Sequence, residues 1–163
     1  MTLNQSGGSF STADLAVGWK NPAGAGSPTG TGVLNLSGGT FETRAATFIG
    51  IEGATGTLNI SGGTFNAGGN EWGSFRISDF GVGTGTLNLS GTGTVNASQY
   101  TAVGGCGNGT LNISGGTWNQ VSGEILVGDY ADANWTGRGD VNQSGGTVNA
   151  KFIHLQKGTY NLN

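Results

Sequence analysis

A short word that recurs along the chain constrains the possible fold more than any other feature. The word reads GTLNISGGTF at residues 56–65 and GTLNISGGTW at residues 109–118. Less perfect copies, or parts of copies, stand at residues 2–10, 32–41, 85–95, 140–148 and 158–162. The position that Leu58 holds in the word recurs every 19 to 31 residues. Self-similarity at such a period is typical of solenoid proteins, in which each repeat forms one coil that stacks on its neighbours.

The alternation of side chains within each repeat indicates three short strands. In residues 57–61, Leu58 and Ile60 alternate with polar residues, so a strand would place both on one face. Gly62 and Gly63 follow and permit a sharp corner. Residues 64–66 alternate again, and a third apolar word at residues 75–77 precedes an insert of variable length. Each repeat therefore predicts one turn of a β-solenoid, with a loop after its third strand.

Stacking of equal words predicts an all-β fold, a single-stranded parallel β-helix of about six coils formed by one domain, residues 1–163. Leu34, Leu58 and Leu87 would lie beside one another, about 4.8 Å apart in a parallel sheet. One coil buries too few apolar groups to offset the entropy of ordering about 20 residues, so the interfaces between coils must supply the stability. We expect one inward column to contain Phe10, Phe41, Phe65, Val95, Trp118 and Val148.

The composition argues against several functional classes. Glycine accounts for 35 of the 163 residues, whereas charged residues make up only 9%. The net charge is −3 and the basic residues are scattered, so the chain lacks the basic stripe that nucleic-acid binding requires. The sequence contains no run of 18 apolar residues, so it predicts no membrane-spanning helix. The single Cys106 cannot form an intrachain disulfide, and no His-rich or Cys-rich cluster indicates a metal or cofactor site.

Both ends of the sequence lie within repeat words. Met1 is followed at once by one copy without a signal peptide, and Asn163 stops inside another copy. We therefore expect a segment of a longer repeat protein, or a processed product of one. An uncovered terminal coil would expose unpaired N–H and C=O groups above apolar side chains. This favours either further coils of a parent chain or end-to-end stacking of copies into fibres.

The central asparagine of the word is the most regular polar feature of the chain. Its main copies are Asn35, Asn59, Asn88, Asn112 and Asn142, and further copies stand at Asn4 and Asn161. If these side chains point outward, they form a row of amides one strand spacing apart, and stacked amides can hydrogen-bond along such a row. We interpret the row as a ladder that fixes the register of the coils. Ligand contact is the functional alternative, and N-glycosylation is a third, because Asn59-Ile60-Ser61 and its copies match N-x-[ST].

The ionisable residues predict no catalytic site. A polysaccharide lyase would need carboxylates and a basic partner on one face, and Glu71, Arg76 and Asp79 come nearest to such a set. Acidic residues also gather at Asp129, Asp132 and Asp140, but their spacing matches no calcium loop, so we interpret them as loop solvation. We expect the single histidine, His154, to be an outward strand residue rather than a base.

Aromatic residues in or near the inserts are the candidates for ligand binding. Such side chains stack on sugar faces and anchor protein interfaces. The alternative is that they fold down over local apolar surface, and the sequence leaves both interpretations open. These residues are Trp19, Trp72, Phe80, Tyr130 and Trp135.

The word GTLNISGGTF, followed by an F-x-I-G word, resembles the autotransporter-associated β-strand repeats of large bacterial surface and secreted proteins. The resemblance covers nearly the whole chain. It implies an extracellular, right-handed parallel β-helix in an adhesin-like passenger, secreted or held at the bacterial cell surface. It supplies no catalytic residues.

These patterns together predict a structural or adhesive surface module rather than an enzyme. Its partners would be further coils or copies of itself, with a glycan as a further candidate. A polysaccharide-binding or lyase-like β-helix is the alternative. Ice binding is a third hypothesis, because threonines align between repeats in two rows, although strand propensity also explains threonine at these positions. The rows are Thr57, Thr86 and Thr110, and Thr40, Thr64, Thr94, Thr117 and Thr147.

Overall fold

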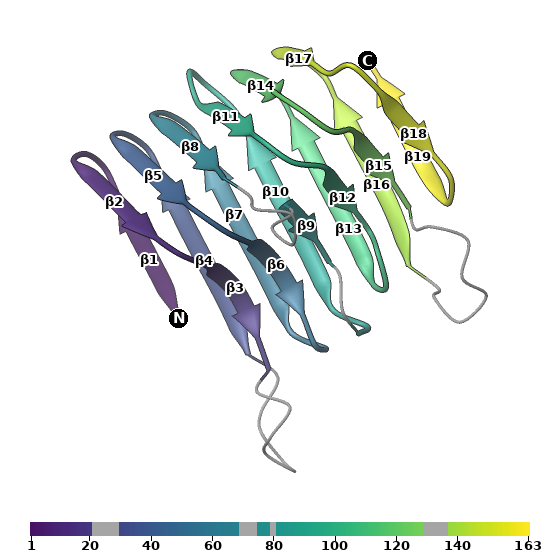
Figure 1. The fold of residues 1–163 in the computed structure, drawn as a ribbon, viewed down its shortest axis with the longest axis horizontal. Helices are drawn as coiled ribbons and strands as arrows, with labels where there is room; N and C mark the ends of the chain where they lie inside the picture. Colours follow the sequence, from purple (N-terminus) through teal and green to yellow (C-terminus); the bar gives the residue numbers. More distant parts are fainter. Residues whose placement is uncertain (21–29, 69–74, 79–80, 129–136) are drawn as a thin grey trace.

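The computed structural model of the chain describes residues 1–20, 30–68, 75–78, 81–128 and 137–163. Every strand in these residues pairs in parallel with the equivalent strand of a neighbouring repeat, and the described residues contain no helix. The expected all-β parallel solenoid is therefore confirmed. Figure 1 shows the coils stacked side by side, with the chain advancing from one end of the stack to the other. The right-handed winding that the family resemblance implies stays a prediction.

Three parallel sheets form the walls of the solenoid. The first sheet contains β1 (Thr2–Gln5), β4 (Thr31–Leu36), β7 (Thr55–Ile60), β10 (Thr84–Leu89), β13 (Asn108–Ile113), β16 (Arg138–Gln143) and β19 (Gly158–Leu162). The second contains β2 (Ser9–Thr12), β5 (Thr40–Thr43), β8 (Thr64–Ala67), β11 (Thr94–Ala97), β14 (Thr117–Gln120) and β17 (Thr147–Asn149). The third contains β3 (Leu15–Trp19), β6 (Thr47–Ile51), β9 (Phe75–Ile77), β12 (Thr101–Val103), β15 (Ile125–Val127) and β18 (Ile153–Leu155). We number the coils by these strands, so that coil 1 is β1–β3, coil 6 is β16–β18, and β19 extends the first sheet alone.

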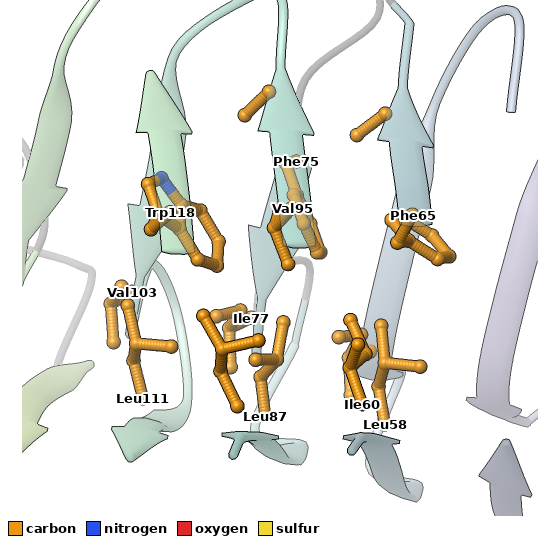
Figure 2. Packing of buried hydrophobic residues seen from close by; sticks show 14 of the residues in the cluster. Leu58, Ile60, Phe65, Phe75, Ile77, Leu87, Val95, Val103, Leu111 and Trp118 are labelled. Carbon is orange, nitrogen blue, oxygen red and sulfur yellow. The ribbon is translucent and has the colours of Figure 1, made fainter. Parts of the chain in front are cut away.

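The register places equal words beside one another. Leu58 pairs with Leu87 and with Leu34, and Asn59 pairs with Asn88. In β7 the exposure alternates along the strand, and Leu58 and Ile60 are fully buried. Figure 2 shows the inward side chains of successive coils lying next to their equivalents. Each such buried aliphatic side chain contributes about 1.5–3 kcal/mol, which is why stacked coils are stable although a single one would not be.

The aromatic column of the second sheet runs along one side of the core. The Phe10 and Phe41 rings lie 4.9 Å apart, and Phe41 and Phe65 lie 5.4 Å apart. The small Val95 follows Phe65 in this column, and Trp118 follows Val95. The ring of Phe75, which comes from the third sheet, lies 5.7 Å from Phe65 and 5.5 Å from Trp118. Phe75 therefore occupies the space that the small Val95 leaves (Figure 2).

A tight corner joins the third sheet to the first. A Cβ at Gly56 would lie 2.0 Å from the Val17 carbonyl oxygen and 2.3 Å from the Gly50 nitrogen, and both are backbone atoms. Only glycine fits there, which explains the glycine that precedes the word in every copy after the first. Ser78 adopts φ 62° at the position where Gly50 has φ 69°, and its hydroxyl donates a buried hydrogen bond to the Gly83 carbonyl at 2.7 Å.

Each end of the stack leaves apolar core side chains open. A hollow of about 510 Å³ at coil 1 is lined by residues of β1, β3 and β4, among them Leu3, Leu15 and Val17. A hollow of about 450 Å³ at coil 6 is lined by Val148, Ile153 and other apolar residues of the last strands. Strand pairing in the described residues continues between these two hollows without a break in the first sheet.

Candidate functional site

The outer face of the first sheet carries a continuous row of hydrogen-bonded asparagine side chains. Each Nδ2 atom donates to the Oδ1 atom of the asparagine in the preceding coil, over distances of 2.7 to 3.0 Å. All of these bonds point the same way, from later to earlier coils. The asparagine row consists of Asn4, Asn35, Asn59, Asn88, Asn112, Asn142 and Asn161.

A shorter asparagine row lies on the second sheet and has the same polarity. Asn96 donates to Asn66, Asn119 to Asn96, and Asn149 to Asn119, at 2.8 to 2.9 Å. At the equivalent position, Glu42 and Ser11 occupy the first two coils. This second row was not predicted from the sequence, because Asn66 and its copies stand outside the TLN word.

The amides of both rows retain binding capacity. An Asn side chain has two N–H donors and an oxygen with two lone pairs, and the ladder uses one donor and one lone pair of an interior residue. The remaining donor and lone pair of Asn59, Asn88 and Asn112 are available at regular spacing along a half-buried face. Such a face could meet the hydroxyl groups of a repeating polar polymer.

Threonines lie beside the asparagine row, but their own row is interrupted. Thr57, Thr86 and Thr110 pair in register, as the repeat predicts. The same row contains Val33 on one side and Asp140 on the other. Only the central coils therefore present an unbroken threonine row on this sheet.

The outer face of the third sheet holds two polar pairs that bridge neighbouring coils. The Arg76 guanidinium donates to the Tyr100 hydroxyl and lies over the Tyr100 ring, 5.3 Å from its centroid. His154 Nδ1 lies 3.0 Å from a carboxylate oxygen of Glu124. His154 is exposed on its strand, as expected, and does not face the core. Arg76 of β9 contacts the residue before β12, in the next coil. His154 of β18 contacts the residue before β15, in the previous coil.

Candidate residues from the sequence are only partly described. Trp19 is the last residue of β3 rather than a loop residue, pairs with Ile51, and is 52% exposed. Of the proposed lyase set, Arg76 lies on β9, where it contacts Tyr100. The other candidates lie outside the described residues: Trp72, Phe80, Tyr130, Trp135, Glu71, Asp79, Asp129 and Asp132.

Asp140 ties the last strand to coil 6. The Arg138 guanidinium donates to the Asp140 carboxylate at 2.9 Å, and the Thr159 hydroxyl of β19 donates to it at 2.7 Å. These hydrogen bonds, with Arg138 the larger cause, lower the pKa of Asp140 below its ordinary value. The neighbouring Tyr160 donates to Gln143 Oε1 at 2.6 Å, and burial raises the pKa of its phenol.

Three glutamines that point inward or are buried were not predicted from the sequence. Gln5 and Gln143 occupy the inward column that Leu36, Ile60, Leu89 and Ile113 fill elsewhere. Gln120 is buried at the end of β14, where its Oε1 accepts from Thr101 at 2.8 Å and from Trp118 Nε1 at 3.3 Å. The signal was present in the words TLNQ and VNQ, which carry Gln where the other copies carry Leu or Ile.

No family model, curated protein or solved structure matches the chain. The described residues contain no cluster of three or more His, Cys, Asp or Glu side chains that could hold a metal ion. The part of the chain that the structure describes also lacks any helix with the length and apolarity needed to cross a bilayer.

Proposed function

We propose that the chain is an extracellular structural or adhesive module, a stiff solenoid rod whose strands are joined by connections of variable length. The supporting observation is the in-register stacking of equal words in all three sheets, tied on the outside by the asparagine row. Every coil meets the next through the same pairing and the same buried columns, so added coils lengthen the rod without changing its cross-section.

The connections between strands vary in length at two corners of this rod. Residues 20–30 and 128–137 join the third sheet to the first, whereas the longest connection of coil 3, residues 68–74, joins the second sheet to the third. The short third-to-first connections that the structure describes, residues 52–54 and 104–107, lie along one edge of the stack (Figure 1). A rod whose connections differ in length and sequence is suited to surface contact, since loops tolerate variation that the stacked words do not.

Glycan binding is the second candidate, and the exposed ring of Trp19 favours it. This indole is half exposed at the insert edge, where an aromatic face can stack on a sugar. The polar outer face of the first sheet, with spare amide donors and acceptors, is the second surface that a glycan could contact. Ice binding is the third candidate. The threonine row of the first sheet is interrupted, and the threonines of the second sheet, which pair in register from Thr40 to Thr147, lie beside the second asparagine row rather than forming a face of threonine alone.

The proposal is tested by binding and turnover measured on the same preparation. The immobilised chain is exposed to a glycan array and to acidic polysaccharides, with and without calcium, and soluble products are followed by ultraviolet absorbance. We expect retention of ligand without release of unsaturated products. Trp19→Ala is expected to weaken glycan binding by about 1 kcal/mol or more, the lower end of the range for an aromatic anchor that becomes buried on binding. Val121→Ala, which changes another exposed apolar residue, is the control and should have no effect. Release of products that stops in Arg76→Ala would overturn the proposal in favour of a lyase.

A further inference from the structure

Gly7, in the first corner of the chain, has open space around it that the equivalent glycines of later coils lack. A Cβ at Gly38 would lie 2.5 Å from the Ser6 carbonyl oxygen, and one at Gly62 would lie 2.5 Å from that of Ser37. The same contact recurs at Gly145, 2.6 Å from the Ser114 oxygen. In each case the glycine of one coil packs closely against a backbone carbonyl of the preceding coil, and a side chain would not fit. Gly7 has nothing within 4 Å, so its missing Cβ leaves room on the open side of coil 1.

A buried acceptor on coil 1 also lacks a partner. Gln5 points inward and its Nε2 atom donates to the Thr40 carbonyl at 3.0 Å. Its Oε1 atom is buried and has no hydrogen-bond partner among the described residues. The other glutamine of the same inward column, Gln143, lies in coil 6 at the opposite end of the stack. Because this oxygen is buried, a new partner requires the Gln5 amide to turn toward the open side of coil 1.

The two ends match column by column when coil 1 is set on coil 6. Leu3 then lies over Val141, Phe10 over Val148, Leu15 over Ile153, and Val17 over Leu155, by the register that relates all other coils. Leu3 and Phe10 are 47% and 49% exposed at one end, and Ile153 and Leu155 are 39% and 55% exposed at the other. The stack would cover all of these side chains. It would also place Gln5 on Gln143, so that the two inward side-chain amides become neighbours.

The polarity of the asparagine row permits only one direction of stacking. Asn4 accepts from Asn35 and so presents its N–H groups on the open side of coil 1. Asn142 presents its oxygen toward the next coil, where it accepts from Asn161 at 2.9 Å. Asn4 of one copy can therefore take the place of Asn161 on Asn142 of another. Two like ends would bring donors against donors or acceptors against acceptors.

The last strand of the chain, β19, occupies part of the coil 6 surface on which a second copy would stack. β19 pairs with β16, and by register Thr159, Tyr160, Asn161 and Leu162 stand where Thr2, Leu3, Asn4 and Gln5 of a following coil 1 would stand. If β1 were instead set upon β19, a strand position would stay empty in the second and third sheets, which hold six strands against seven in the first. A complete contact therefore needs β19 to leave.

We propose that a second copy of the chain stacks head to tail on coil 6 through its β1–β3, displacing β19, which acts as an internal strand that limits this association. The inference rests on the proposed structural role, to which it adds the partner and the means of control. β19 contacts coil 6 through one strand, whereas a second copy contacts it through three. The contact is heterologous and does not close, so it produces filaments rather than a dimer. β19 competes because it is tethered, with an effective concentration on the order of millimolar.

The test uses the full chain with weakened β19. Tyr160→Ala with Leu162→Ala removes the hydrogen bond to Gln143 and the apolar contacts of β19. Sedimentation velocity over a concentration series is expected to show association at least 10-fold tighter than for the wild type. Adding Gly7→Ala is expected to reverse the gain by at least 10-fold, because its methyl group would meet the Ser144 carbonyl of the partner copy, as Gly38 meets Ser6. Thr86→Ala, in the middle of the first sheet, is the control that leaves association unchanged.

A glutamine exchange tests the predicted neighbours directly. In the weakened β19 background, Gln5→Leu alone and Gln143→Leu alone are each expected to reduce association, because one amide stays buried without a partner. The two changes together should restore association, since they recreate the aliphatic contact that Leu and Ile make at this position in the interior coils. Circular dichroism melting checks that each variant is folded. If Tyr160→Ala with Leu162→Ala does not fold, Thr159→Ala with Asn161→Ala weakens β19 through its polar contacts instead.

Two results would overturn the inference. One is a folded, weakened-β19 variant that associates no more than the wild type. The other is association that Gly7→Ala leaves unchanged, which would show non-specific contact through the uncovered core. Neither result bears on ligand retention by the monomer, so the glycan and turnover measurements still decide the proposed function separately.

Discussion

The asparagine row should stabilise the fold through cooperation between neighbouring coils, and Asn88→Ala tests this. Asn88 donates to Asn59 Oδ1 at 2.7 Å and accepts from Asn112 Nδ2 at 2.8 Å. A net contribution of about 0.5–1.5 kcal/mol for each hydrogen bond gives a loss of about 1–3 kcal/mol. The row is partly exposed and water can replace part of the interaction, so we expect the lower half of this range. Asn161→Ala is the matched control, because Asn161 is the last residue of the row and has only one neighbour in it.

The assay is urea unfolding followed by circular dichroism, with the midpoint shift read at an unchanged m-value. Asn161→Ala is expected to cost less than half of what Asn88→Ala costs. A double-mutant cycle with Asn59→Ala and Asn88→Ala isolates the shared bond, and we expect a coupling energy of about 0.5–1 kcal/mol. If the two single changes add within about 0.3 kcal/mol, the amides contribute independently and the ladder does not tie the coils.

The remaining predictions concern a corner glycine and a titrating carboxylate. Gly56→Ala is expected to destabilise the fold by more than about 3 kcal/mol, which exceeds the usual range for overpacking. The added methyl group would collide with the Val17 carbonyl, and this backbone cannot move aside easily. An unchanged melting midpoint would contradict the corner geometry. Asp140 has a lowered pKa in the folded chain, so its hydrogen bonds stabilise the fold above the ordinary Asp pKa, and this contribution disappears as the pH falls through the lowered value. Arg138→Gln should move the NMR titration midpoint of Asp140 upward toward the ordinary value, and a midpoint that stays in place would remove Arg138 as the principal cause.

Much of the fold could be predicted because the repeat encodes register as well as strands. The alternation in residues 57–61 determines which side chains face inward, and equal words can align in only one way without burying Asn59. The first-sheet strands begin earlier than the word suggests, at Thr55 and Asn108 in two coils, because the residue before the corner glycine also pairs with its neighbours.

Contacts between non-equivalent residues could not be predicted in the same way. The Phe75 ring fills the space beside Val95 only because the third sheet folds back against the second, and no local pattern carries that information. The pairs Arg76 with Tyr100 and Glu124 with His154 join the middle of a third-sheet strand to the residue before the neighbouring strand. The register brings these positions together, but the residues at them differ between repeats, so no recurring word indicates the pairs. Four of the five aromatic candidates lie outside the described residues, and their role stays a prediction.

The uniform direction of the asparagine row gives the molecule an electric dipole along the stack of coils. Main-chain hydrogen bonds between coils run both ways, as the Ser37 nitrogen to the Gln5 oxygen and the Leu15 nitrogen to the Ala46 oxygen illustrate, so their dipoles largely cancel. The side-chain amides from Asn35 to Asn161 all donate toward the N-terminal coil, and their dipoles add. The N-terminal end of the rod is therefore the positive pole and the C-terminal end the negative pole, and each coil added in register lengthens the dipole. Rods of this kind should align in an applied electric field with one fixed sense.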